Sequence, residues 1–105
     1  MLVQSQFKEN EIICFRITTG EEIVAKLKEE DDKTYKVTKP LALVNGPKGV
    51  VMVPAMVTVD KDTEITYNKS AIISTSKPNK AVEGSYVENT SGLVMAKAND
   101  AKIKV

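Results

Sequence analysis

The sequence predicts an all-β fold, a small and strongly bent five-stranded barrel with a short N-terminal helix and an extra C-terminal segment. Short β-prone runs follow one another closely from residue 11 to residue 76, turn-forming residues separate them, and no convincing helix interrupts them. The 105 residues suffice for one domain with a modest core. We assign residues 1–78 to the barrel and residues 79–105 to a C-terminal extension that packs on the barrel or extends from it.

The first predicted elements are a helix and a hairpin. Residues 2–10 place three apolar side chains near one face of a short amphipathic helix. Residues 11–17 then alternate in the manner of a strand, and residues 22–28 form the second strand of the hairpin. Gly20 falls in the turn between them, where glycine can adopt a positive φ.

Two longer strands follow, and each contains a proline. The charged residues 29–33 form a turn into a strand over residues 35–44, where Pro40 marks a bulge or an edge. Residues 45–49, Asn-Gly-Pro-Lys-Gly, give the strongest turn signal in the chain. Residues 50–59, VVMVPAMVTV, then form a long and nearly continuous apolar strand that is broken only by a proline.

The β region ends with the segment ITYNKSAIIST, residues 65–75. Two β-prone runs flank the trio Asn68-Lys69-Ser70, which taken alone is an ordinary turn composition. Farther on, Asn79 is suited to begin a helix over AVEGSYVEN, although Gly84 weakens the helical pattern.

The composition argues against catalysis. Histidine is absent, which removes the usual general base and the commonest transition-metal ligand. Cys14 is the only cysteine, so no disulfide forms within one chain, and its apolar neighbours predict a packed strand position. The acidic run over residues 29–32 lacks the spacing of a calcium-binding loop. We expect no enzymatic activity, no metal and no cofactor.

Charge and hydropathy limit the partners and the cellular location that we expect for the protein. Fifteen basic and fourteen acidic residues give a net charge of +1, which excludes a strongly basic nucleic-acid-binding surface but allows a local basic patch. No apolar run approaches the length of a membrane span, and the N-terminus lacks the apolar segment of a signal peptide. We therefore expect no membrane partner and a cytoplasmic location.

The first half of the chain resembles the first motif of the Sm/LSm superfamily. This motif places a glycine in the hairpin, then a small residue, a leucine and an aspartate, and continues into another apolar strand. The stretch ICFRITTGEEIVAKLKEEDDKTYKVTKPLAL follows that order. The positions that match are Gly20, Ala25, Leu27 and either Asp31 or Asp32.

The second half resembles the second Sm motif, a strand, a turn with a basic residue and a closing strand. ITYNKSAIISTSKP has that shape and is closer to the bacterial Hfq branch of the superfamily than to its eukaryotic branch. Asn68 or Lys69 stands where the family has its basic residue. The resemblance covers residues 12–78 and implies an Sm-like (SH3-like) barrel with Tyr67 packed inside.

The resemblance also implies a homo-oligomeric ring, because Sm-like proteins pair an edge strand of one subunit with an edge strand of the next. The resemblance implies that the edge strands in this chain are residues 50–59 and residues 71–76. Residues 50–59 are more apolar than a monomer of this size needs, as expected of a strand that packs against a neighbour. The same run also fits a strand buried on both faces of a monomer.

Single-stranded RNA is the ligand that the resemblance implies. Tyr35 would stack on an unpaired base, Asn68 would hydrogen-bond a base edge, and Lys69 would pair with a phosphate or a pyrimidine carbonyl. Lys33 adds a positive charge in the adjacent turn. A ring would make these weak contacts multivalent. Tyr35 equally fits a half-buried packing residue, and the trio at 68–70 a plain turn.

A second class of function stays open. The same barrel can act as a structural or assembly module, for example in a phage or virion, through protein–protein contacts alone. The absence of catalytic residue types does not separate the two classes. A third interpretation, an SH3-like peptide-binding domain, requires an aromatic groove that three tyrosines without a tryptophan supply poorly.

Overall fold

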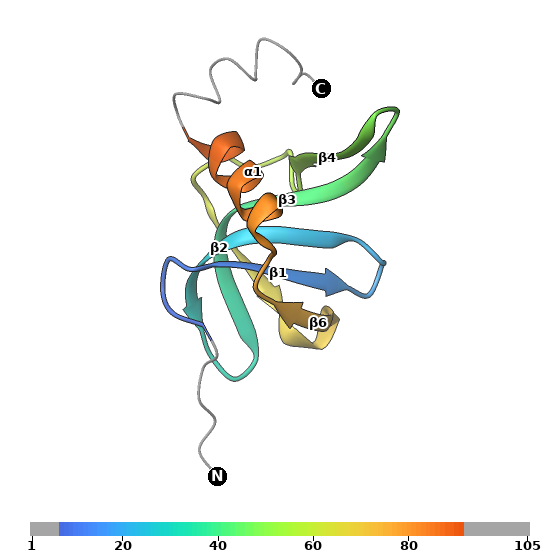
Figure 1. Ribbon diagram of the computed structural model, residues 1–105. Helices are drawn as coiled ribbons and strands as arrows, with labels where there is room; N and C mark the ends of the chain where they lie inside the picture. The colour runs from blue at the N-terminus through green and yellow to red at the C-terminus, as the bar shows by residue number, and fades with distance from the viewer. Residues whose placement is uncertain (1–6, 92–105) are drawn as a thin grey trace.

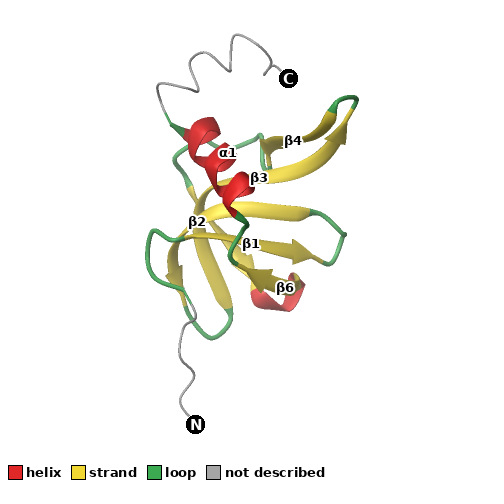
Figure 2. Cartoon of the chain, in the orientation of Figure 1, coloured by secondary structure: helices red, strands yellow, loops and turns green. Residues whose placement is uncertain are grey.

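A computed structural model describes residues 7–91 and shows an antiparallel β-sheet with one α-helix packed on it (Figure 1). The secondary structure along the chain is drawn in Figure 2. The elements are β1 (Ile12–Ile17), β2 (Glu22–Glu30), β3 (Thr34–Gly46), β4 (Gly49–Pro54), β5 (Glu64–Asn68), the short 3₁₀ helix η1 (Lys69–Ala71), β6 (Ile72–Ser76) and α1 (Lys80–Thr90). The all-β prediction is thus confirmed for this part of the chain, with a helix added.

The strand order is β4-β3-β2-β1-β6, and β5 also pairs with β3. The long strand β3 serves two partners. Its first half, residues 34–38, pairs with β5, and its second half, residues 41–46, pairs with β4. Within residues 7–91 the sheet therefore has six strands rather than the five predicted, and it does not close on itself, since β4 and β6 end the path.

The Gly20 hairpin and the Pro40 bulge are both confirmed. Gly20 has a φ of +100° in the turn between β1 and β2. In the β2–β3 ladder, Val24 faces Leu41 but Lys26 faces Thr38, so β3 carries one extra residue at this point. Lys39, just before the proline, has a φ of +51°. The additional residue bends β3 and divides it into its two halves.

The core lies inside the bend of the sheet. It contains one cluster of buried apolar side chains: Phe7, Ile13, Phe15, Ile23, Ala25, Leu27, Tyr35, Val37 and Ala42. Phe15 is at its centre, stacked parallel to Tyr35 with ring centroids 6.2 Å apart and edge-on to Tyr67 at 4.9 Å. Tyr67 thus packs against the core as the sequence predicted.

The helix α1 begins where Asn79 predicts it. The Asn79 side-chain oxygen accepts a hydrogen bond from the Val82 backbone N–H at 2.8 Å, which caps the first turn. Tyr86 is buried and its hydroxyl lies 2.9 Å from the Lys39 carbonyl oxygen and 3.2 Å from that of Thr38. The helix is thereby attached to the bulge of β3. Residues 92–105, the rest of the predicted extension, lie outside the described residues.

The predicted strand over residues 50–59 is wrong in its second half, because β4 ends at Pro54. Leu41 pairs with Pro54, and the Ala55 N–H still reaches the Pro40 carbonyl at 2.9 Å. Beyond the bulge, β3 already pairs with β5, beginning with Thr38 opposite Glu64. No ladder position is left for residues 55–59, which form an irregular connection.

The predicted helix over residues 2–10 is not present at residues 7–10, which form a turn, and its remaining residues lie outside the described range. Asn10 has a φ of +72°, a left-handed conformation that a right-handed helix excludes. Its N–H donates to the Leu27 carbonyl at 2.6 Å, so the turn is fastened to β2.

Candidate functional site

The four predicted RNA-contacting residues come together at one corner of the sheet, formed by residues 30–35 and 67–70, which we name the turn corner. Thr34 pairs with Asn68, and Tyr35 pairs with Tyr67. The Lys69 backbone N–H donates to the Lys33 carbonyl at 2.8 Å. Segments that are more than thirty residues apart in the sequence thus meet through the β3–β5 ladder and one further backbone hydrogen bond.

Lys69 has two partners within the turn corner. Its Nζ lies 2.6 Å from the Glu30 Oε2 and 4.8 Å from the centroid of the Tyr35 ring. The side chains of the ion pair are only 28% and 14% exposed, for Lys69 and Glu30 respectively. The cation therefore interacts with a carboxylate and with an aromatic face at once.

Tyr35 is 6% exposed and belongs to the core. One face of its ring is stacked on Phe15, and the Lys69 ammonium lies over the ring. A nucleobase would stack on Tyr35 only if the ring left these contacts. Asn68 and Lys33, by contrast, are exposed.

The acidic turn has a structural role. The Asp31 Oδ1 accepts hydrogen bonds from the Lys33 N–H, the Thr34 N–H and the Thr34 hydroxyl at 2.8, 2.8 and 3.0 Å. These bonds, the one from the Lys33 backbone first, lower the pKa of Asp31 below its ordinary value. Within residues 7–91 no three acidic or cysteine side chains gather in a way that suits a metal ion.

The charges of the turn corner do not favour an anion. The turn corner contains three carboxylates, of Glu30, Asp31 and Asp32, and two ammonium groups, of Lys33 and Lys69. One of those ammonium groups is already paired with Glu30. The other, Lys33, has no ion pair among the described residues, so a phosphate at this corner would contact Lys33.

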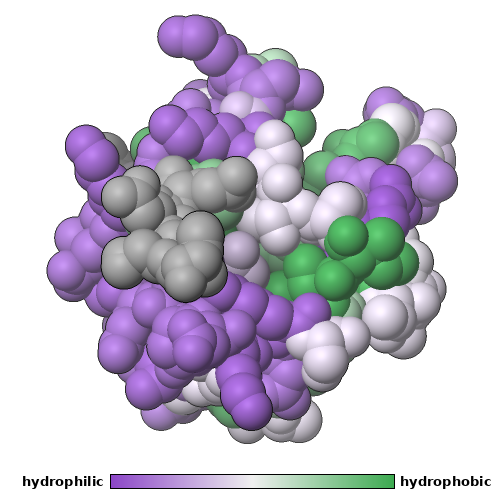
Figure 3. All heavy atoms as spheres, turned by 90° about the horizontal axis from the view of Figure 1, so that it is seen from below, coloured by the Kyte–Doolittle hydropathy of each residue, from purple (hydrophilic) through white to green (hydrophobic). Residues whose placement is uncertain are grey.

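The two ends of the sheet expose apolar side chains. Within residues 7–91, β4 pairs only with β3, and β6 pairs only with β1. Val50 and Val51 on β4 are 62% and 46% exposed, and Ile73 on β6 is 61% exposed. Seen from below the view of Figure 1, apolar side chains gather on one side of the molecule, and polar ones cover most of the remaining face (Figure 3).

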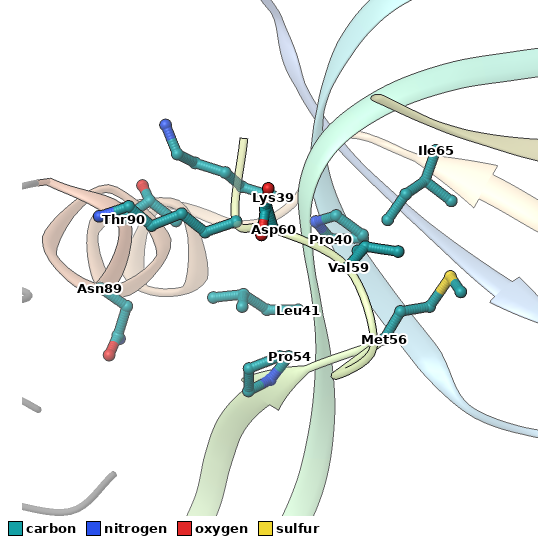
Figure 4. A pocket seen from close by; sticks show the side chains of 11 residues that line it. Lys39, Pro40, Leu41, Pro54, Met56, Val59, Asp60, Ile65, Asn89 and Thr90 are labelled. Atoms are coloured by element: carbon teal, nitrogen blue, oxygen red, sulfur yellow. The ribbon is translucent and has the colours of Figure 1, made fainter. Parts of the chain in front are cut away.

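A pocket that the sequence did not predict lies between β3, the connection after β4, and α1 (Figure 4). Its volume is about 90 Å³. Leu41, Pro54 and Met56 contribute apolar surface, and Asn89 and Thr90 of α1 line the opposite side. Since these residues come from segments that only the bulge and the docked helix bring together, no local sequence pattern marks the pocket.

Cys14 is half-buried on β1, and its Sγ lies 3.4 Å from the Ser76 carbonyl oxygen on β6. Burial, and secondarily the charge of Glu22, raises the pKa of the Cys14 thiol. A raised pKa keeps the sulfur protonated near neutral pH and therefore weakly nucleophilic.

Comparison with models of known protein families and with curated proteins finds no match to this chain. Among residues 7–91, no helix has the length and apolar character needed to cross a membrane.

Proposed function

We propose that this chain is a non-enzymatic, Sm-like protein that assembles with copies of itself into a ring and binds single-stranded RNA. The observation that carries the proposal is the pair of sheet ends, β4 and β6, which pair on one side only within the described residues and expose apolar side chains. Free strand edges of this kind favour pairing with another chain. An edge of one copy joined to the different edge of the next is a heterologous contact, which closes into a ring when its rotation allows.

The path of residues 64–76 supports the barrel part of the proposal. β5 pairs with β3, η1 turns the chain, and β6 pairs with β1 on the other side of β2. One continuous segment thus reaches around the bent sheet, and Tyr67 of this segment contacts Phe15.

A charge on the β4 edge tests the assembly. Val51→Lys should convert an oligomer into a monomer, because a lysine on an edge strand opposes strand pairing and its ammonium resists burial. Val87→Lys is the matched control, since Val87 has a similar exposure of 49% but lies on α1 and not on an edge strand. Multi-angle light scattering at micromolar concentration measures the mass of each variant.

The assembly proposal fails if the unmodified protein is a monomer in this experiment. It also fails if Val51→Lys keeps the mass of the unmodified protein.

The RNA-binding part of the proposal is supported by the turn corner, where Asn68 and Lys33 are exposed side by side with η1. Repeated around a ring, an amide and an ammonium from each copy would contact one strand multivalently. Fluorescence anisotropy with labelled oligo-U and oligo-A, measured over a range of salt concentrations, tests this part, because phosphate contacts make affinity salt-dependent.

The second candidate is an assembly module that contacts proteins only. The burial of Tyr35 and the pairing of Lys69 with Glu30 favour it, since both reduce what the turn corner offers to RNA. An intact oligomer with no measurable affinity for either oligonucleotide would establish this candidate in place of the first.

A further inference from the structure

We propose that Glu30 withholds Lys69 from RNA, so that each copy offers the phosphate backbone one cation at the turn corner, Lys33. This inference rests on the proposed RNA-binding function and concerns the same site. It follows from the contacts of Lys69, its burial and the charges around it.

Lys69 is held in place on three sides. Its ammonium is 2.6 Å from the Glu30 carboxylate and lies over the Tyr35 ring, and its backbone N–H is bonded to the Lys33 carbonyl. A phosphate oxygen that approached Lys69 would have to replace the Glu30 oxygen at the same nitrogen.

The low exposure of the pair makes this replacement costly. Both side chains are less than one-third exposed, so the pair is screened less by water and salt than a surface ion pair. Displacing Lys69 would also break its 2.6 Å contact with Glu30, whose side chain is only 14% exposed. A hydrogen bond between two charged groups is stronger than one between neutral groups.

Lys33 differs from Lys69 both in its exposure and in its ion pairing. It is exposed, and its ammonium has no ion pair among residues 7–91. A contact between Lys33 and a phosphate thus breaks nothing in the protein. Asn68, also exposed, supplies an uncharged amide beside it, so the site is built to combine one phosphate contact with one base-edge contact.

The salt dependence of RNA affinity counts these cations. For single strands, log K falls with log salt by a slope of about 0.7 per phosphate neutralised. We expect a slope of about 0.7 per engaged subunit for the unmodified protein and about 1.4 for Glu30→Gln, which removes the competing charge and keeps the shape of the side chain.

Asp32→Asn is the matched control. It removes the same charge from the same corner, but Asp32 is exposed and pairs with no lysine among the described residues. We expect its slope to equal that of the unmodified protein. Lys33→Gln, a change at an exposed position that should not affect folding, provides a second readout, and we expect it to abolish most of the salt dependence.

The outcomes distinguish a failure of this inference from a failure of the proposed RNA binding. If the unmodified protein binds oligo-U or oligo-A but Glu30→Gln leaves the slope unchanged, or Lys33→Gln retains it, the inference is overturned and RNA binding stands. If neither the unmodified protein nor Glu30→Gln binds these oligonucleotides as an intact oligomer, the inference and the proposed RNA binding are both overturned.

Discussion

Tyr86 shows how much a single side chain contributes to the placement of α1. Its ring is buried, and its hydroxyl donates to the carbonyls at the bulge of β3. Burial raises the pKa of Tyr86 well above its ordinary value, so the hydroxyl remains a donor over the working pH range. The residue therefore joins the helix to the bulge of β3 near Lys39, the irregular point of the β2–β3 ladder at which β3 bends.

Tyr86→Phe should lower the free energy of unfolding by about 1–2 kcal/mol, because the bulge carbonyls lose a donor at a buried position. Tyr67→Phe is the control, since no hydrogen bond of the Tyr67 hydroxyl is found among residues 7–91. Urea unfolding followed by circular dichroism measures both variants. Equal losses of stability in the two variants would contradict the role given to the Tyr86 hydroxyl.

The sequence predicted where the residues of the turn corner lie but not which contacts their side chains make. The resemblance to the second Sm motif located Asn68 and Lys69 in a turn, and the structure brings them beside Lys33 and Tyr35. The ion pair of Lys69 joins residues 39 positions apart, so no local pattern indicates it. Whether these side chains bind RNA stays a prediction.

Among the elements, the two hairpin strands β1 and β2 depend on the turn at Gly20. A φ of +100° is strained for any residue with a side chain, although the space around Gly20 is open. Gly84, in the middle of α1, also has open space around it but sits in an ordinary helical conformation.

Gly20→Ala should therefore lower the free energy of unfolding by about 1 kcal/mol or more, whereas Gly84→Ala should raise it by about 0.4–1 kcal/mol. The same substitution thus has opposite signs at two exposed glycines. Thermal and urea unfolding of the two variants provide the measurement, and a stabilised Gly20→Ala protein would show that the hairpin tolerates another turn type.

The elements that the sequence predicted well are those with a local cause. Gly20 in its turn, the bulge at Pro40 and the cap at Asn79 each follow from the conformational or hydrogen-bonding preference of one residue. The end of β4 at Pro54 has a distant cause, since it depends on β5 occupying the other half of β3. The apolar residues after Pro54 continue the pattern of a strand although no ladder position remains for them.

At the scale of the molecule, the sequence predicted a β fold but not the six strands found in residues 7–91, because the count depends on how β3 divides between β4 and β5. The same division creates the pocket beside α1. Among the described residues, ion pairs also join segments that lie far apart in the sequence. Lys77, between β6 and α1, lies 2.6 Å from Glu11, just before β1.

This pair and the Asp31 turn should set the acid stability of the protein. The Lys77 side chain lowers the pKa of Glu11 from its ordinary 4.5, and backbone N–H groups lower the pKa of Asp31 from 3.8. For a carboxyl with a lowered folded-state pKa, the unfolded state binds the proton more readily. The resulting stability is complete above the ordinary pKa and is lost as the pH falls through the folded-state pKa.

We therefore expect the urea midpoint to be constant from neutral pH down to about pH 5 and to decline below it, at one fixed protein concentration. Asp31→Asn keeps an oxygen that can accept the turn hydrogen bonds but removes the titration, so its decline should be shallower. Asp32→Asn, at an exposed carboxyl without a hydrogen bond or ion pair among the described residues, should decline as the unmodified protein does. Parallel declines in all three proteins would show that the Asp31 turn does not set the acid limit, because the proton uptake of unfolding would then come from other carboxyls.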